Sequence, residues 1–544
     1  MKMLLLWAFI VFLAYTEPLP GIDQQALQMA IQKKSLTRIS CTPDWKTLDI
    51  GKLAARITPL PGTGKWNWKI TSTNDSARFY FNQGIRLYYG FHIVEAVPSF
   101  RKAQQFDPNS AILYWGEALA LGPNINDIGY IASVEAYSAA QKAVAHLSTA
   151  SAKEKLLIEA IQLRYSLDSS IQQSVLNEQY AAAMRGAFTQ FDHDADVGAI
   201  YADALMLLHP WDFWNHDGTP KAWTPEIVGL LEKILRNEPN HPGANHYYIH
   251  TIEASANPER AINSANRLGS LAPSLSHMVH MPSHIYVRTG DYQKGIDVNT
   301  SAVQKYAQYK LLYPAVEEKA DLYEIHNRHM QAACAIQLDN YSNAFKVARE
   351  TRQSISPDWM DIPKLGYYIQ YIYLTPEMTM LAFGHWDDLL AQPEFADRLT
   401  YARILQHFAK GVAYARKGQV KEATQRLAQM DQLLKDTLLA EPIGAMNAPK
   451  SGGLVARSIL AGAIAEANGM PGDAFNVYST AVDLEDAMIY NEPKDWLIPA
   501  RRFLGEAFLK AGLIENARLV FNTDLKKNPG NLYAKNGLTA CNKK

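Results

Sequence analysis

Near the C-terminus, residues 504–529 read LGEAFLKAGLIENARLVFNTDLKKNP. Small residues in this stretch fall where two antiparallel helices would cross, aromatic residues fill the gaps between them, and a glycine marks the turn. The positions that carry the pattern are Leu504, Gly505, Phe508, Gly512, Ala517, Phe521 and Pro529. The stretch therefore predicts a helical hairpin about 34 residues long.

The same spacing recurs elsewhere in the chain, which makes the hairpin a repeat. A second copy is carried by Gly84, Ala96, Phe100, Ala103 and Pro108. A third lies between Pro239 and Pro273, one repeat length apart. These are the spacing and residue types of the tetratricopeptide repeat. We therefore predict an all-α, tetratricopeptide-type solenoid of helical hairpins with insertions.

The composition is that of a folded helical chain too long for one core. Its 544 residues are 48% apolar and 20% charged, which excludes disorder, collagen and a small disulfide scaffold. Lys and Arg number 53 and Asp and Glu number 54, a net charge of −1, so no global field gathers nucleic acid or a membrane surface. We expect no nucleic-acid partner, and any ligand must be held by a local site.

The sequence divides into five parts. We assign a signal peptide to residues 1–16, a loop-rich lead-in to 17–74, an N-terminal repeat array with a histidine cluster to 75–356, a connecting insertion to 357–400 and a C-terminal repeat array to 401–544. Lys2 precedes an apolar run, Leu4 to Tyr15, that is too short to span a bilayer and is typical of secretory signals. We expect a secreted or periplasmic protein without a membrane span in its mature chain, or one retained by an N-terminal anchor.

The cysteines give no metal or redox motif. Cys41, Cys334 and Cys541 are the only three, and none has CxxC spacing. The sequence leaves open whether Cys41 pairs with Cys541.

The histidines are clustered in one part of the sequence. Of its fifteen histidines, five fall between His246 and His284. On a helix over 241–255, His246, His250 and Glu253 share one face, because they lie at i, i+4 and i+7. Adding the repeat length of 34 carries His246 to His280 and His250 to His284.

A third helix extends this pattern. The turn at residues 339–341 matches the turn at 290–292, and that offset of 49 carries His277 to His326 and His280 to His329. Neutral imidazole is a common metal ligand, and together with a carboxylate it suits zinc, copper or iron. The metal ligands that we predict on the concave face are His246, His250, Glu253, His277, His280, His284, His326 and His329.

Four short stretches resemble exported bacterial tetratricopeptide-repeat proteins. They are FNQG (81–84), YWGEA (114–118), HPGANHYYIH (241–250) and HMPSHIY (280–286). The resemblance extends over nearly the whole mature chain. It implies the fold and an exported bacterial setting, and it brings no established reaction with it.

Two functions compete at this point. The first is a metal-binding protein with copper, iron or zinc in a histidine-rich concave site, and one form of it is a copper or iron oxidase or oxygenase. Storage or delivery of the metal without turnover is a variant of this reading. The alternative is a non-catalytic scaffold whose groove binds a peptide, a protein or a small molecule. The sequence identifies neither the substrate nor any catalytic residue.

Overall fold

The structure is a computed structural model that describes residues 49–126, 133–168, 170–312, 322–442 and 446–543. The predicted signal peptide, most of the lead-in and Cys41 lie outside these residues. Within them, helices are the regular elements, and an isolated antiparallel bridge joins Trp214 to Pro220. None of the described helices combines the length and apolar composition that a membrane crossing requires.

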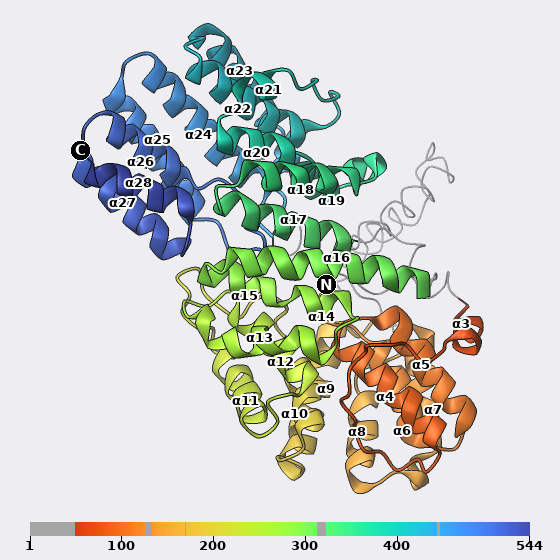
Figure 1. The fold of residues 1–544 in the computed structure, drawn as a ribbon. Helices are drawn as coiled ribbons and strands as arrows, with labels where there is room; N and C mark the ends of the chain where they lie inside the picture. Colours follow the sequence, from red (N-terminus) through yellow and green to blue (C-terminus); the bar gives the residue numbers. More distant parts are fainter. Residues whose placement is uncertain (1–48, 127–132, 169, 313–321, 443–445, 544) are drawn as a thin grey trace, which may run out of the picture.

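The helices follow one another through the whole described chain (Figure 1). The first half contains α3 (Ile50–Arg56), α4 (Asp75–Tyr89), α5 (Ile93–Phe106), α6 (Ala111–Ala120), α7 (Val134–Ala145), α8 (Ala152–Gln162), α9 (Gln173–Gln190), α10 (Ala195–Met206), α11 (Thr224–Asn237), α12 (Pro242–Ile252), α13 (Ile262–Leu271), α14 (Ser276–His280) and α15 (Pro282–Thr289). The second half contains α16 (Tyr292–Leu312), α17 (Leu322–Gln337), α18 (Tyr341–Gln353), α19 (Leu365–Tyr373), α20 (Thr375–Phe383), α21 (Trp386–Leu390), α22 (Thr400–Arg416), α23 (Val420–Leu433), α24 (Pro449–Ala467), α25 (Pro471–Asp486), α26 (Ala500–Lys510), α27 (Ile514–Lys527) and α28 (Leu532–Asn542).

Glycines let the two helices of a hairpin approach closely. A Cβ atom on Gly84 of α4 would lie 2.8 Å from the ring of Phe100 on α5, and one on Gly505 of α26 would lie 2.5 Å from the ring of Phe521 on α27. Gly462 and Tyr478 repeat the relation between α24 and α25 at 2.6 Å. In each pair an aromatic ring fills the space that the missing side chain leaves. These contacts confirm the tetratricopeptide-type hairpins and the all-α solenoid.

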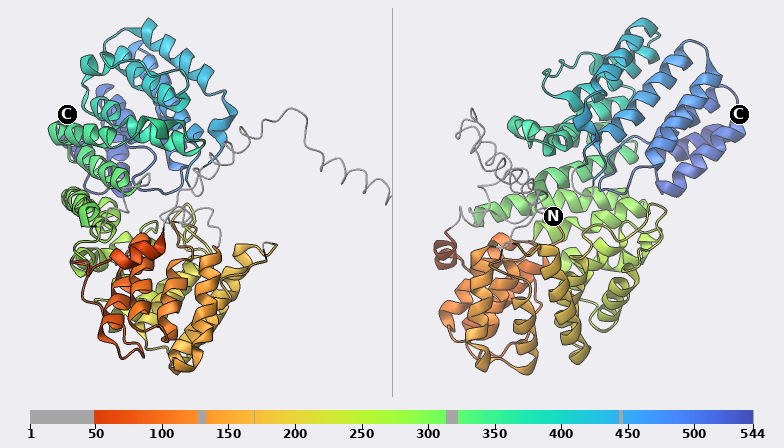
Figure 2. Two further views of the ribbon diagram at one scale, coloured as in Figure 1. Left: turned by 90° about the vertical axis from the view of Figure 1, so that its right-hand side faces the viewer. Right: turned by 180° about the vertical axis from the view of Figure 1, so that it is seen from behind.

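The hairpins stack into two lobes that meet around α16 (Figures 1 and 2). One apolar core runs from Ile50 to Tyr309 and a second from Tyr292 to Ala507, so α16 contributes to both. Between α25 and α26, the non-helical segment 488–499 returns toward the middle of the molecule and places Glu492 beside His284 of α15. The C-terminal lobe thus contributes a side chain to the histidine cluster.

Candidate metal centre

Four helices near the junction of the lobes carry six clustered histidines. His246 and His250 lie one turn apart on α12, which begins at Pro242. His277 and His280 lie on α14, His284 on α15 and His326 on α17. Pro282 is the first residue of α15. Proline is tolerated in the first turn of a helix and breaks a helix interior, so α14 and α15 are separate helices. All of these rings except the partly buried His326 are buried.

The six rings form two groups. The first triad is His246, His250 and His277, and the second triad is His280, His284 and His326; within each, one ring nitrogen per residue lies within 4.8 Å of the others. In the first triad the two Nε2 atoms of His246 and His277 are 3.0 Å apart. In the second, His284 Nε2 lies 2.8 Å from His280 Nε2 and 3.4 Å from His326 Nε2.

These separations fit a shared metal ion. Two imidazole nitrogens bound at about 2.0–2.1 Å, with an angle of roughly 90–120° at the metal, lie about 2.8–3.6 Å apart. The three Nε2 separations in the structure span 2.8–3.4 Å. The remaining ring of the first triad, His250, has a buried Nε2 without a hydrogen-bond partner. The donor sets of both triads therefore fit a transition metal.

The repeat relates the two triads member by member. The 34-residue offset carries His246 to His280 and His250 to His284, and the 49-residue offset carries His277 to His326. A third copy of the α12 pair would need histidines at 329 and 333, and the latter position is Ala333. The doubling of the site therefore follows from the doubling of the hairpin, and it ends where the third copy lacks its second ring.

Hydrogen bonds fix which nitrogen carries the proton in two of the rings. His246 Nδ1 lies 2.6 Å from the carbonyl oxygen of Tyr89, so this nitrogen donates. His280 Nδ1 lies 2.6 Å from Asn299 Oδ1, and that amide is oriented because its nitrogen donates to the carbonyl of Gly295. A neutral imidazole carries one proton, so Nε2 of both rings is a bare lone pair. Each triad contains one ring prepared in this way.

Glu253 joins the two triads. Its Oε1 lies 3.2 Å from His250 Nδ1, and its Oε2 lies 2.5 Å from His284 Nδ1. An ionised Glu253 accepts both Nδ1 protons and so leaves both Nε2 atoms free to bind metal. The same three residues form a third group with metal-ligand spacing. A metal bound to Glu253 would lie on the Nδ1 side of His250 and His284, whereas the two triads use the Nε2 side of the same rings. The two arrangements therefore exclude each other.

Burial keeps the imidazoles neutral. It lowers the pKa of His246 to about 3 and of His280 to about 4, because a charged ring loses its hydration there. Burial and then the neighbouring rings hold the pKa of His250, His277, His284 and His326 well below the ordinary value. Neutral imidazole is the form that binds metal, so the cluster is ready for a cation near neutral pH.

A second buried carboxylate adjoins the second triad. Glu492 Oε1 lies 3.5 Å from His284 Nδ1, and burial raises the pKa of Glu492 to about 8. Burial and then the charge of Glu492 raise the pKa of Glu253 well above its ordinary value. Arg288 donates to the backbone carbonyls of Glu253 and Ser255 at 3.0 Å each. A bound metal cation would stabilise the ionised forms of both carboxylates.

Two aromatic side chains cover the first triad. The Phe91 ring lies 4.5 Å from His246, 5.5 Å from His277 and 5.9 Å from His250, measured between centroids. The ring of Trp211, in the insertion between α10 and α11, lies 5.1 Å from His250. Phe91 and Trp211 both have left-handed backbones, with φ of 57° and 62°. Strain of this kind persists where the surroundings require a side chain in one place.

The structure brings together seven of the eight predicted ligands. His329 joins neither triad: both of its ring nitrogens are buried without a hydrogen bond, and its ring packs on Tyr371 at 5.6 Å. Phe91, Trp211 and the segment that carries Glu492 lie against the rings of the two triads.

Sequence reasoning missed the groups that orient the imidazoles. Tyr89 contributes only a carbonyl, which every residue has, and Asn299 and Glu492 lie far along the chain from the rings that they contact. No spacing rule links them to the histidines. Of the other polar residues near the cluster, Tyr323 contacts His277 with ring centroids 5.0 Å apart.

The fold and this centre define a tetratricopeptide-type helical-repeat protein with two buried histidine triads. No family model matches the chain, and no curated protein matches it in sequence. Among solved structures it is similar to the human IFIT1 dimer with m7Gppp-AAAA, at 12% identity and a TM-score of 0.30, over 87% of this chain and 90% of that one.

Two further structures are similar in the same way. Yeast Tom70 is 12% identical with a TM-score of 0.27, over 86% of this chain and 89% of that one. A Pyrococcus horikoshii signal-transduction ATPase with a tetratricopeptide repeat sensor, PH0952, is 14% identical with a TM-score of 0.33, over 82% of this chain and 55% of that one. At these values the ligands of those proteins carry no argument about this chain.

Proposed function

We propose that this protein binds two transition-metal ions, one in each histidine triad. The observation that carries the proposal is the convergence of Nε2 atoms in two repeat-related groups, at separations of 2.8–3.4 Å. Without a metal, the bare lone pair of His246 Nε2 accepts the Nε2 proton of His277, and a cation would take the place of that proton. His246 and His280, whose Nδ1 protons are committed to Tyr89 and Asn299, supply one such lone pair to each site.

The two sites adjoin and form one dinuclear centre. The ring centroids of His250 and His284 are 5.9 Å apart, and those of His277 and His280 are 6.1 Å apart. Each pair has one ring from each triad. Glu253 contacts both triads through its two oxygens, so the protonation of one site is linked to that of the other.

Copper and zinc are the metals that the donor set favours. Each triad offers three imidazoles, without thiolate or carboxylate, and such nitrogen-only sites suit copper and zinc. Iron would be favoured by the alternative group of His250, Glu253 and His284, which has the two-histidine, one-carboxylate composition of non-haem iron sites. The two arrangements differ in metal count, two against one.

With copper or iron, the centre would supply electron transfer to dioxygen, which is the chemistry of an oxidase or oxygenase. In that role this chain's residues hold the metals, orient the imidazoles and exclude bulk water. The buried surroundings of the triads favour a small reactant such as dioxygen. The apolar run Leu4–Tyr15 supports export to the periplasm or the exterior, with retention by an N-terminal anchor as the variant.

Elemental analysis of untagged protein, after loading with Cu(I), Zn(II) or Fe(II) under anaerobic conditions, tests the proposal. We expect two equivalents of metal in the wild type and one in the His284→Ala variant, with the fold intact by circular dichroism. If the wild type binds one equivalent of metal and the His246→Ala and His326→Ala variants still bind it, the metal lies in the alternative group of His250, Glu253 and His284. Absence of metal under all loading conditions would refute the proposal.

The alternative function is a scaffold that binds a peptide or protein partner. The observation in its favour is the fold, because solenoids of helical hairpins present extended surfaces to partners. A scaffold needs no metal, so it predicts that the His284→Ala variant and the wild type capture the same partner with the same affinity. Loss of that binding together with the metal would assign the partner to the metal centre.

A further inference from the structure

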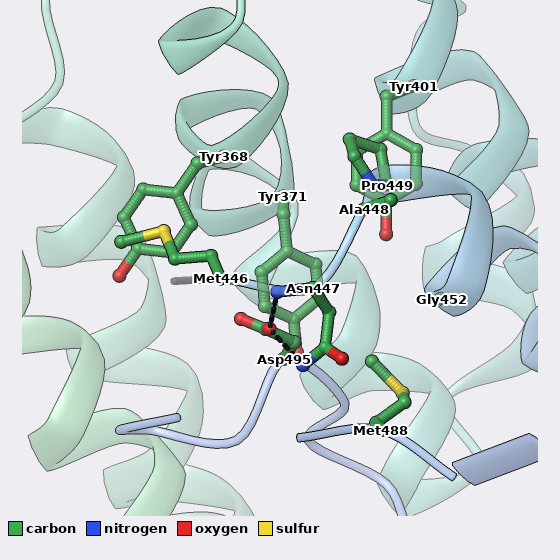
Figure 3. Close-up of a pocket in the computed structure, with 10 residues that line it drawn as sticks. All are labelled: Tyr368, Tyr371, Tyr401, Met446, Asn447, Ala448, Pro449, Gly452, Met488 and Asp495. Carbon is green, nitrogen blue, oxygen red and sulfur yellow. Dashed lines mark hydrogen bonds between the residues drawn. The ribbon is translucent and has the colours of Figure 1, made fainter. Parts of the chain in front are cut away.

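A second site lies in the C-terminal lobe, apart from the triads. It is a pocket between α19, α22, the start of α24 and the segment 488–499 (Figure 3). Aromatic rings and thioethers make up much of its wall, with Asn447 and Asp495 as its amide and its carboxylate. The rings and thioethers are Tyr368, Tyr371, Tyr401, Met446 and Met488.

Among the described residues, no Lys, Arg or His pairs with the Asp495 carboxylate. Its Oδ2 accepts from Asn447 Nδ2 at 2.8 Å and from the Asn447 backbone N–H at 3.4 Å, and its Oδ1 accepts from Asn491 Nδ2 at 2.8 Å. These donors are neutral amides. Burial raises the pKa of Asp495, because its charged form loses hydration there, and a cationic ligand would stabilise the ionised carboxylate.

The rest of the wall suits a cation that carries alkyl groups. Tyrosine rings attract cations through their π faces, and methionine thioethers are soft, apolar contacts. Asp495 already accepts three N–H groups, so it has little room for a ligand with several donors of its own. A fully methylated ammonium group has no N–H to satisfy and interacts through its charge and its methyl groups.

The pocket opens to solvent, as a headgroup on a longer molecule requires. Met446, Asn447 and Met488 are partly exposed, so the pocket opens to solvent on their side. Gly452 faces the Tyr401 hydroxyl, where a Cβ atom would lie 2.5 Å from the oxygen, so this glycine makes room for the tyrosine.

We propose that this pocket binds a methylated ammonium headgroup, with Asp495 supplying the charge and the tyrosines the π faces. The proposal is independent of the metal centre, because no residue of either triad lines the pocket. A free small molecule such as choline and a trimethyllysine side chain of a protein carry the same headgroup. The pocket chemistry is shared by both sources.

Calorimetric titration of the full-length protein tests the proposal with choline and with 3,3-dimethylbutan-1-ol, its uncharged carbon isostere. We expect choline to bind at least about tenfold more tightly than the isostere. Equal affinities would show an apolar pocket and overturn the proposal, as would no choline binding at tens of millimolar. A trimethyllysine peptide that binds more tightly than choline would identify a protein as the source of the headgroup, and the reverse order would identify a small molecule.

Two variants separate charge from ring. Asp495→Asn keeps the size of the side chain and removes its charge, so choline binding should fall by at least about tenfold. Tyr368→Phe keeps the π face and should retain choline binding, whereas Tyr368→Leu should weaken it. Tyr368→Leu that binds as well as Tyr368→Phe would overturn the role of the ring. Melting curves confirm folding, and the comparison of choline with its isostere in the wild type stands even if a variant misfolds.

Discussion

Glu253→Gln should disable one metal site and spare the other. When it is ionised, the carboxylate accepts Nδ1 protons from His250 at 3.2 Å and from His284 at 2.5 Å, one histidine from each triad. A glutamine has one accepting oxygen and one donating nitrogen, so it can accept only one of these protons. The other imidazole must accept from the amide and carry its proton on Nε2, which blocks the lone pair that binds metal.

The size of the effect follows from this geometry. Loss of such an outer contact weakens a metal site by about 10–100-fold, or about 1.4–2.7 kcal/mol. The metal-free protein should melt at nearly the same temperature, because glutamine keeps the size of the side chain and burial disfavours the charged form of Glu253, whose pKa it raises. A drop in metal affinity without a drop in metal-free stability therefore separates the orienting role from damage to the fold.

The assay is a metal titration against a competing chelator that resolves two binding constants. Glu232→Gln is the matched control, because Glu232 accepts from Tyr248 and Arg260 at 2.6 Å each and contacts neither triad. Two unchanged constants in Glu253→Gln would refute the orienting role. Complete loss of a single wild-type equivalent would show that Glu253 is itself a ligand in a mononuclear site.

Three further results are expected. His326→Ala should reduce the metal content from two equivalents to one, whereas His329→Ala should leave two; equal losses measured by elemental analysis would return His329 to the ligand set. Burial lowers the pKa of His329 to about 3 from an ordinary value of 6.5. Between these two pH values the unfolded chain binds one more proton than the folded chain. The folded state is therefore destabilised as the pH falls from about 6.5 to about 3. Urea unfolding of metal-free His329→Leu at pH 7 and pH 5 should therefore show a smaller loss on acidification than the wild type, by up to about 1.4 kcal/mol per pH unit, and an identical loss would contradict that burial. Gly505→Ala should lower the melting temperature, because the added methyl group overlaps Phe521, at a cost of about 1–3 kcal/mol. The control is Gly229→Ala in α11, where the space around the glycine is open and the change should raise stability by about 0.5–1 kcal/mol. A Gly505→Ala variant that is more stable than the wild type would contradict the close packing of the hairpin.

Local spacing predicts the hairpins well because their contacts are short-range. The partners Gly84 and Phe100, and Gly505 and Phe521, lie 16 residues apart in each case, so both members fall within one repeat. The helix predicted from His241 to Ser255 is α12, Pro242–Ile252. Small residues and aromatic rings at fixed offsets are enough to determine such pairs.

The histidine pattern predicts which rings share a helix face, but it does not predict how the six rings divide into two triads. The sequence offsets lead from His246 and His250 to their counterparts, and the structure then joins His277 to the first triad, away from its α14 neighbour His280. Which triad a ring joins depends on the helix break at Pro282 and on how the helices pack. The sequence periodicity predicts neither of these features. His329 shows the limit of the method, because its register matches and its surroundings do not.

The contact between Glu492 and His284 also has a consequence for how the protein is made. Synthesis runs from the N-terminus, so all six imidazoles leave the ribosome before Glu492 does. Under the proposed function, metal that bound early would meet triads that the C-terminal segment does not yet close. Completion of the centre waits for the last hairpins to fold and dock, so a chain truncated before residue 488 would keep every imidazole of both triads and still leave the centre open.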